Sequence, residues 1–274
     1  MAEENCHRGV QGHCGRGCLK PIGVFDSGVG GLSILKALRS QLPAEDFVYL
    51  ADAGFAPYGE RGDDYVIERT RVVVDRLLRA HQVKALVIAC NTATAAAVHL
   101  VRAQYPGLPL VGVEPALKPA VALSKTRRIG VIGTRGTLTS AKVRTLHDSL
   151  KDQADFVFVP CDGLADAIQN DDAGQITQLS ARYMQALGSF GGEEGQIDTL
   201  VLGCTHYPFA QHYLAAHAGE NVKMIETGEP VARQTRRLLE AAGLLKAEGE
   251  GSVTLLTTGS QQALEAAARR WLGI

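Results

Sequence analysis

The sequence has no apolar run near the roughly 18–20 residues that a membrane-spanning helix needs. Its first twenty residues also lack the apolar core of a secretory signal, so we expect a cytoplasmic protein with reduced thiols. Charge of one sign is missing as well, because 29 acidic residues nearly balance 28 basic ones and the pI is about 6.7. Nucleic-acid-binding domains usually have a pI above about 9. We therefore expect neither a nucleic acid nor a membrane as a partner.

Cysteine is too scarce for a disulfide framework, with six in 274 residues. Three of the six lie in the first twenty residues together with His7 and His13, and such a cluster is a candidate zinc site. Its spacing matches no standard zinc finger, and no hydrophobic pattern surrounds it. We therefore interpret residues 1–20 as a flexible extension and expect no metal.

From residue 21 onward, short β-branched runs alternate with longer helical patterns. Most of the runs are continuously apolar, which is typical of strands buried on both faces of a parallel sheet. The helical stretch 65–81 is apolar on one face, with Asp63 and Asp64 as its expected N-caps. The alternation predicts an α/β fold with helices on both faces of each sheet. The expected strands are 22–25, 47–50, 85–89, 110–113, 129–132, 156–159, 199–202, 223–225 and 253–256.

The chain also resembles itself. Residues 22–27 (IGVFDS) match 129–134 (IGVIGT), and residues 85–90 (ALVIAC) match 199–204 (TLVLGC) at nearly the same offset. Any two buried strands look alike, but a cysteine after the second strand of each pair favours a true repeat. We expect two pseudo-symmetric lobes with mainly parallel sheets and a ligand between their facing strand ends. The first lobe would comprise residues 21–113 and 226–274, and the second residues 114–225.

Polar loops follow several of these strands. Residues 26–31 (DSGVGG) are similar to a dinucleotide-binding loop, but Ser33 stands where the third glycine should be. No lysine follows the glycines, so the next helix N-terminus suits a carboxylate as well as a phosphate. Residues 56–59 (APYG) offer amides and a phenol. The other loops of this kind are 90–94 (CNTAT), 133–134 (GT) and 203–208 (GCTHYP).

Cys90 and Cys204 each lie where a strand ends and a helix begins. The helix dipole predicts a thiol pKa below its usual value of about 8.5, which favours the thiolate. His206 is close enough in sequence to set the protonation of Cys204, and Asp26 could do the same for Cys90. For Cys161 we expect the ordinary role of a small buried hydrophobic residue.

Two thiols that face one ligand restrict the classes of enzyme to which the chain can belong. A disulfide reductase would need a Cys-x-x-Cys motif, which is absent, and a cysteine hydrolase needs only one thiol with a histidine base. If one thiolate removes a proton from a carbon and the opposing thiol protonates the other face, a stereocentre is inverted. No pyridoxal site is evident, so we expect no cofactor and a carbanion stabilised by oriented donors.

In combination, these motifs resemble those of the glutamate racemases, in the cofactor-independent aspartate/glutamate racemase superfamily. The resemblance runs from Pro21 to the C-terminus. It implies interconversion of L- and D-glutamate, with D-glutamate supplied for peptidoglycan and cell-wall biogenesis. It further implies that Cys90 takes the proton from D-glutamate and Cys204 from L-glutamate, and that Asp26 and His206 assist these thiols. The implied substrate-binding residues are Asp26, Ser27, Pro57, Tyr58, Gly59, Asn91, Thr92, Thr134, Thr205 and His206.

The chain departs from the family pattern at Gln169, where family members commonly have a Glu that supports the second-lobe thiol. An amide cannot act as a base, so we expect an altered pH profile or an altered balance between the two directions. Three other functions remain open: racemisation of aspartate, amino-acid binding without turnover, and a redox sensor that links Cys90 to Cys204. Because family members associate in more than one way, the resemblance also allows a homodimer.

Overall fold

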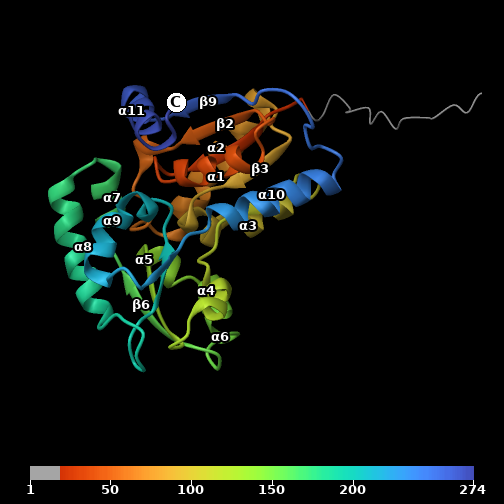
Figure 1. The fold of residues 1–274 in the computed structure, drawn as a ribbon. Helices are drawn as coiled ribbons and strands as arrows, with labels where there is room; N and C mark the ends of the chain where they lie inside the picture. The colour runs from red at the N-terminus through yellow and green to blue at the C-terminus, as the bar shows by residue number, and fades with distance from the viewer. Residues whose placement is uncertain (1–18) are drawn as a thin grey trace, which may run out of the picture.

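The computed structural model describes residues 19–274, which form two α/β lobes (Figure 1). Each lobe contains one parallel sheet with helices on both of its faces, as the sequence predicts. The prediction of an extension at residues 1–20, and the zinc site considered within it, lie almost wholly outside the described residues.

The first sheet has the strand order β4-β3-β1-β2-β9, and all of its neighbouring strands are parallel. The last strand of the chain therefore returns to pair with β2. The strands are β1 (Ile22–Asp26), β2 (Phe47–Ala51), β3 (Ala85–Ile88), β4 (Leu110–Gly112) and β9 (Val253–Thr257).

Five helices cover this sheet. On one face pack α1 (Leu32–Gln41), α10 (Gly228–Ala241) and α11 (Gln261–Leu272). On the other face pack α2 (Asp63–His81) and α3 (Asn91–Gln104), and a short 3-10 turn, η1 (Ala53–Phe55), follows β2.

The second sheet has the order β6-β5-β7-β8 and is also parallel throughout. Its strands are β5 (Arg128–Gly133), β6 (Asp155–Pro160), β7 (Thr199–Gly203) and β8 (Lys223–Ile225). The remaining elements surround it: α4 (Leu117–Leu123), α5 (Arg135–Leu138), α6 (Ala141–Asp148), α7 (Leu164–Gln169), α8 (Ala173–Leu187), η2 (Tyr207–Ala210) and α9 (Gln211–Ala218).

The structure confirms all nine expected strands to within one or two residues at each end. The expected N-caps of α2 are wrong, because Gly62 is the N-cap and Asp63 and Asp64 lie inside the first turn. There the two carboxylates still interact favourably with the helix dipole. None of the helices in residues 19–274 is long and apolar enough to cross a membrane.

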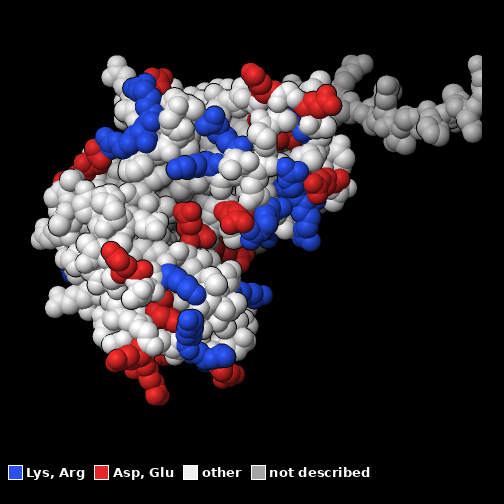
Figure 2. Space-filling view, in the orientation of Figure 1, with Lys and Arg blue, Asp and Glu red and all other residues white. Residues whose placement is uncertain are grey.

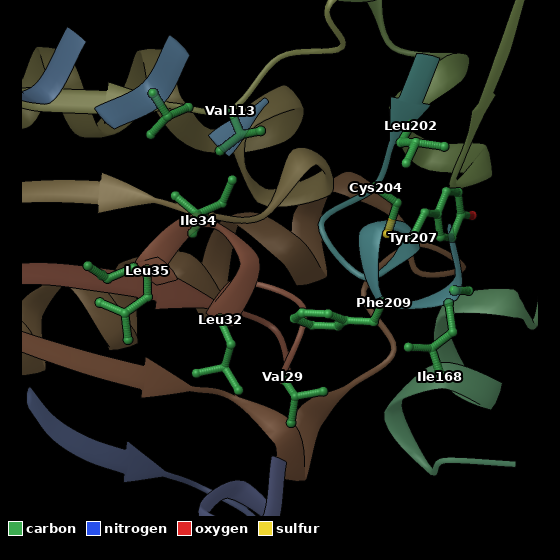
Figure 3. Close-up of a cluster of buried hydrophobic side chains, with 14 of the residues drawn as sticks. Val29, Leu32, Ile34, Leu35, Val113, Ile168, Leu202, Cys204, Tyr207 and Phe209 are labelled. Carbon is green, nitrogen blue, oxygen red and sulfur yellow. The ribbon is translucent and has the colours of Figure 1, made fainter. Parts of the chain in front are cut away.

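One cluster of buried hydrophobic side chains continues from the first lobe into the second. Figure 3 shows Phe209 of the second lobe pointing toward Val29 and Leu32 of the first. The ring of Phe209 also stacks on Trp271 of α11, with 4.3 Å between the ring centroids. The two lobes therefore share apolar packing directly behind the loop that carries Cys204.

Candidate active site

A pocket lies between the lobes, at the carboxyl ends of strands from both sheets. This is where ligands bind in open parallel sheets. Of the residues proposed from the sequence, all but Asp26 line it directly: Ser27, Pro57, Tyr58, Gly59, Cys90, Asn91, Thr92, Thr134, Cys204, Thr205 and His206. Asp26 lies immediately behind them and is completely buried.

Cys90 lies at the start of α3, where its sulfur accepts the backbone N–H of Ala93 at 3.4 Å. The hydroxyl of Ser27 is 3.6 Å from the same sulfur. Burial, followed by the charge of Asp26, raises the pKa of the Cys90 thiol to about 11. The prediction that the helix dipole makes this thiol more acidic is therefore wrong, because desolvation outweighs the helix N-terminus.

Cys204 follows β7, and its sulfur lies 3.8 Å from Nδ1 of His206. Burial raises the pKa of this thiol well above its ordinary value, again the opposite of the direction predicted from the sequence. Burial also lowers the pKa of His206 to about 4. Burial therefore favours the protonated form of both thiols and the uncharged form of the imidazole.

Asp26 connects the two lobes. One carboxylate oxygen accepts the Gly28 N–H at 2.6 Å, and the other accepts the Thr205 hydroxyl at 2.9 Å. Burial raises the pKa of Asp26 from its ordinary value of 3.8 to about 7, although these hydrogen bonds oppose the increase. Its charge also raises the pKa of Cys90 and of Cys204. Asp26 can therefore hold or release a proton near neutral pH while influencing both sulfurs.

Asn91 is buried with no hydrogen-bond partner for either atom of its amide group. Leaving a buried polar group unpaired costs roughly 1–3 kcal/mol of folding free energy. A ligand that hydrogen bonds to this amide would remove that cost. Nearby, the hydroxyl of Thr92 is 3.0 Å from that of Thr134 in the other lobe. The pocket therefore presents both amide and hydroxyl groups to a polar molecule from both sides.

Tyr58 is held by a buried carboxylate that sequence reasoning missed. Its hydroxyl donates to Asp52 at 2.6 Å, and Asp52 also accepts two hydrogen bonds from Arg69 and one from Thr258. The signal was available, because Asp52 directly follows a strand, as the other site residues do. The hydrogen bonds from Arg69 and Thr258 fix the Asp52 carboxylate, and this carboxylate in turn holds the Tyr58 hydroxyl at the pocket wall.

Other pocket residues were also missed by the site prediction, among them Glu60, Arg135, Asp162 and Asp166. Glu60 and Arg135 each follow a proposed motif directly, whereas Asp162 and Asp166 follow strand β6. Charged side chains at such positions are also typical of ordinary surface loops. Across residues 19–274, no group of three or more His, Cys, Asp or Glu side chains could hold a metal ion. On the face shown in Figure 2, acidic and basic side chains are interspersed.

Known proteins resemble this chain in sequence and in fold. The family model Asp/Glu/Hydantoin racemase matches residues 22–235. A glutamate racemase of Pseudomonas syringae pv. tomato is 46% identical over 87% of this chain and 85% of its own length. One from Methylococcus capsulatus is 47% identical, over 82% of this chain and 81% of its own length.

Solved structures of glutamate racemases have a similar fold. The glutamate racemase isoform RacE1 from Bacillus anthracis has a TM-score of 0.82 and 34% identity, covering 93% of this chain and 94% of that one. The Francisella tularensis glutamate racemase in complex with D-glutamate has a TM-score of 0.79 and 27% identity, covering 94% and 95%.

Proposed function

We propose that this protein is a racemase that interconverts L- and D-glutamate. The chain belongs to the Asp/Glu/hydantoin racemase family, whose model matches residues 22–235, and it is 46% identical to a glutamate racemase. The observation that carries the proposal is the placement of Cys90 and Cys204, one from each lobe, on the same pocket. The unpartnered amide of Asn91 supports a polar, amino-acid-sized ligand there. Similarity to proteins named as glutamate racemases supports glutamate as that ligand.

The reaction from L-glutamate begins at Cys204. The thiol gives its proton to Nδ1 of His206, 3.8 Å away, and the resulting thiolate removes the proton from the substrate Cα. Cys90 then donates its own S–H proton to the opposite face of the carbanion, which gives D-glutamate. The imidazolium of His206 returns its proton to solvent and Cys90 recovers one, so the protons balance over a turnover.

From D-glutamate the same steps run in reverse, and Cys90 must first lose its proton. Ser27 lies 3.6 Å from the Cys90 sulfur and its side chain hydrogen bonds to Asp26. Because the pKa of Asp26 is raised by burial to about 7, its carboxylate can accept a proton that passes through Ser27. Asp26 would thus serve Cys90 as His206 serves Cys204.

Substrate binding would fall to the polar groups that line the pocket. The amide of Asn91 and the hydroxyls of Thr92, Thr134 and Thr205 can bind the two carboxylates, while Ser27, Tyr58 and the backbone of Pro57 and Gly59 complete the wall. Burial of this set excludes water, which strengthens each contact and protects the carbanion. The D-glutamate formed would supply peptidoglycan synthesis in the cytoplasm.

The proposal is tested by circular dichroism of L-glutamate incubated with reduced protein after treatment with a metal chelator and hydroxylamine, which removes pyridoxal. We expect the optical activity to decay to zero with catalytic amounts of protein. A parallel sample with L-aspartate identifies the substrate. If the optical activity decays with aspartate and not with glutamate, the substrate is aspartate. Stoichiometric glutamate binding with no decay of either sample would refute racemisation and favour a binding protein.

A further inference from the structure

Gln169, at the end of α7, contacts both lobes inside the pocket. Its amide oxygen accepts the backbone N–H of Val29 at 2.8 Å and lies 3.1 Å from Nε2 of His206. A backbone N–H can only donate, so the Val29 contact identifies the amide atom that faces it as the oxygen. The backbone of the first lobe therefore fixes the orientation of the Gln169 amide.

The orientation of Gln169 determines the protonation of His206. An amide oxygen can only accept, so the Nε2 atom of His206 must be the donor in their contact. A neutral imidazole carries one N–H, which leaves Nδ1 with a free lone pair. Nδ1 is the atom that faces the Cys204 sulfur at 3.8 Å.

The loop after β1 is shaped to fit this pair. A Cβ at position 28 would collide with the amide oxygen of Gln169, and one at position 30 would collide with Nδ1 of His206. Glycine at both positions allows the backbone to pack directly against the two side chains. The Gln169–His206 contact is therefore held between the lobes.

We propose that Gln169 is a positioning residue that holds His206 as the Nε2–H tautomer, so that Nδ1 is free to take the proton of Cys204. In that step the S–H bond of Cys204 breaks and an N–H bond forms at Nδ1. The sulfur keeps the electron pair, and the new imidazolium still donates from Nε2 to Gln169. The consequence for catalysis rests on the proposed racemase function, whereas the tautomer does not.

A neutral amide at this position differs from a carboxylate in one respect. It accepts the Nε2–H without adding a negative charge, so it does not stabilise the imidazolium before Cys204 delivers its proton. The other titratable or charged groups around the pocket are Asp26, Tyr58, Glu60, Cys90, Arg135, Cys161, Asp162, Asp166 and Cys204. All of them are unchanged in the variants below, so differences between variants report on position 169.

The tautomer is tested by nitrogen NMR of reduced protein labelled with ¹⁵N-histidine, without substrate, across a pH series. The chain has eight histidines, and a His206→Gln sample identifies the signals of His206 by their absence. We expect the neutral Nε2–H form in the wild type. In Gln169→Leu, which has no acceptor, we expect both tautomers, and in Gln169→Glu we expect imidazolium at pH values where the wild type is neutral.

Kinetics test the consequence. L- and D-glutamate are equally stable, so kcat/KM must be equal in the two directions for every variant. We expect Gln169→Leu to lower kcat by roughly 100-fold, the lower end of what a positioned acid–base group contributes, with KM little changed. Gln169→Glu should move the acid limb of the pH profile upward by about 1–3 pH units. Gln178→Glu, an exposed position on α8, is the matched control and should match the wild type.

An Nδ1–H tautomer in the wild type would overturn the inference, as would an unchanged His206 spectrum in Gln169→Leu. An acid limb that does not move in Gln169→Glu would also contradict it, and this isosteric variant guards against misfolding of the leucine variant. If the expected tautomer is found but neither glutamate nor aspartate is racemised, the proposed function fails and the positioning of His206 stands.

Discussion

Replacing Asp26 with Asn should stabilise the protein at alkaline pH while it impairs the reaction. Burial raises the pKa of Asp26 from 3.8 to about 7, so the folded protein holds a proton that the unfolded chain releases. Between these pH values the contribution of Asp26 to the stability of the folded protein falls as pH rises. The difference of about 3 pH units corresponds to roughly 4 kcal/mol, and this whole penalty is present above pH 7.

Asparagine can keep the contacts that the carboxyl group makes with Gly28 and Thr205. Its oxygen can accept the Gly28 N–H, and its NH₂ can donate to the hydroxyl of Thr205, which can rotate to accept. The variant should therefore match the wild type near pH 4, where the wild-type carboxyl is protonated. The gap should then widen to at most roughly 4 kcal/mol by pH 8.

The assay is urea unfolding of both proteins at pH 4, 6 and 8, followed by circular dichroism. The quantity that matters is the difference in the free energy of unfolding at each pH, since the titration of His206 is common to both proteins and cancels. An Asn variant that is no more stable than the wild type at pH 8 would refute the argument that the Asp26 charge is destabilised by burial.

Two further predictions concern charges away from the pocket. Lys84 Nζ and Glu45 are 2.5 Å apart with both side chains 1% exposed, so Lys84→Met should cost roughly 3–5 kcal/mol by leaving Glu45 buried and unpaired. In urea unfolding, adding Glu45→Gln should recover most of that loss, and equal losses in the single and double variants would contradict this. Burial raises the pKa of Asp198, but hydrogen bonds from Ser124 and from backbone N–H groups lower it to about 2. The contribution of the Asp198 carboxylate to folding stability is therefore present above pH 4 and is lost as pH falls toward 2. Asp198→Asn should therefore lower Tm at pH 7 and lower it progressively less below pH 4; a constant deficit would contradict the assignment.

Much of the fold could be predicted from the sequence because buried parallel strands are continuously apolar and short. Most of the expected strands are such runs, and their short length distinguishes them from the helices. Helix ends were less predictable. The N-cap of α2 is Gly62 because the aspartates at 63 and 64 are favourable inside the first turn as well as before it.

The sequence located residues that line one pocket, but it did not predict their electrostatics. Cys90 and Cys204 were located from the ends of strands, and the structure places both on one pocket. Their raised pKa values depend on burial in the folded protein, which no local sequence pattern encodes. The contacts of Asp26 with Thr205, and of Gln169 with His206, likewise join residues far apart in the sequence.

In the proposed mechanism two different thiols handle the proton, one on each face of Cα. The most direct measurement is NMR of the first turnovers of L-glutamate by the wild-type protein in D₂O. A thiol exchanges its proton with solvent, so Cys90 should deliver deuterium. We predict D-glutamate that is fully deuterated at Cα, while the remaining L-glutamate still carries protium. Early D-glutamate that retains the Cα proton of the substrate would mean that one group moves the proton between faces, and would contradict the two-thiol mechanism.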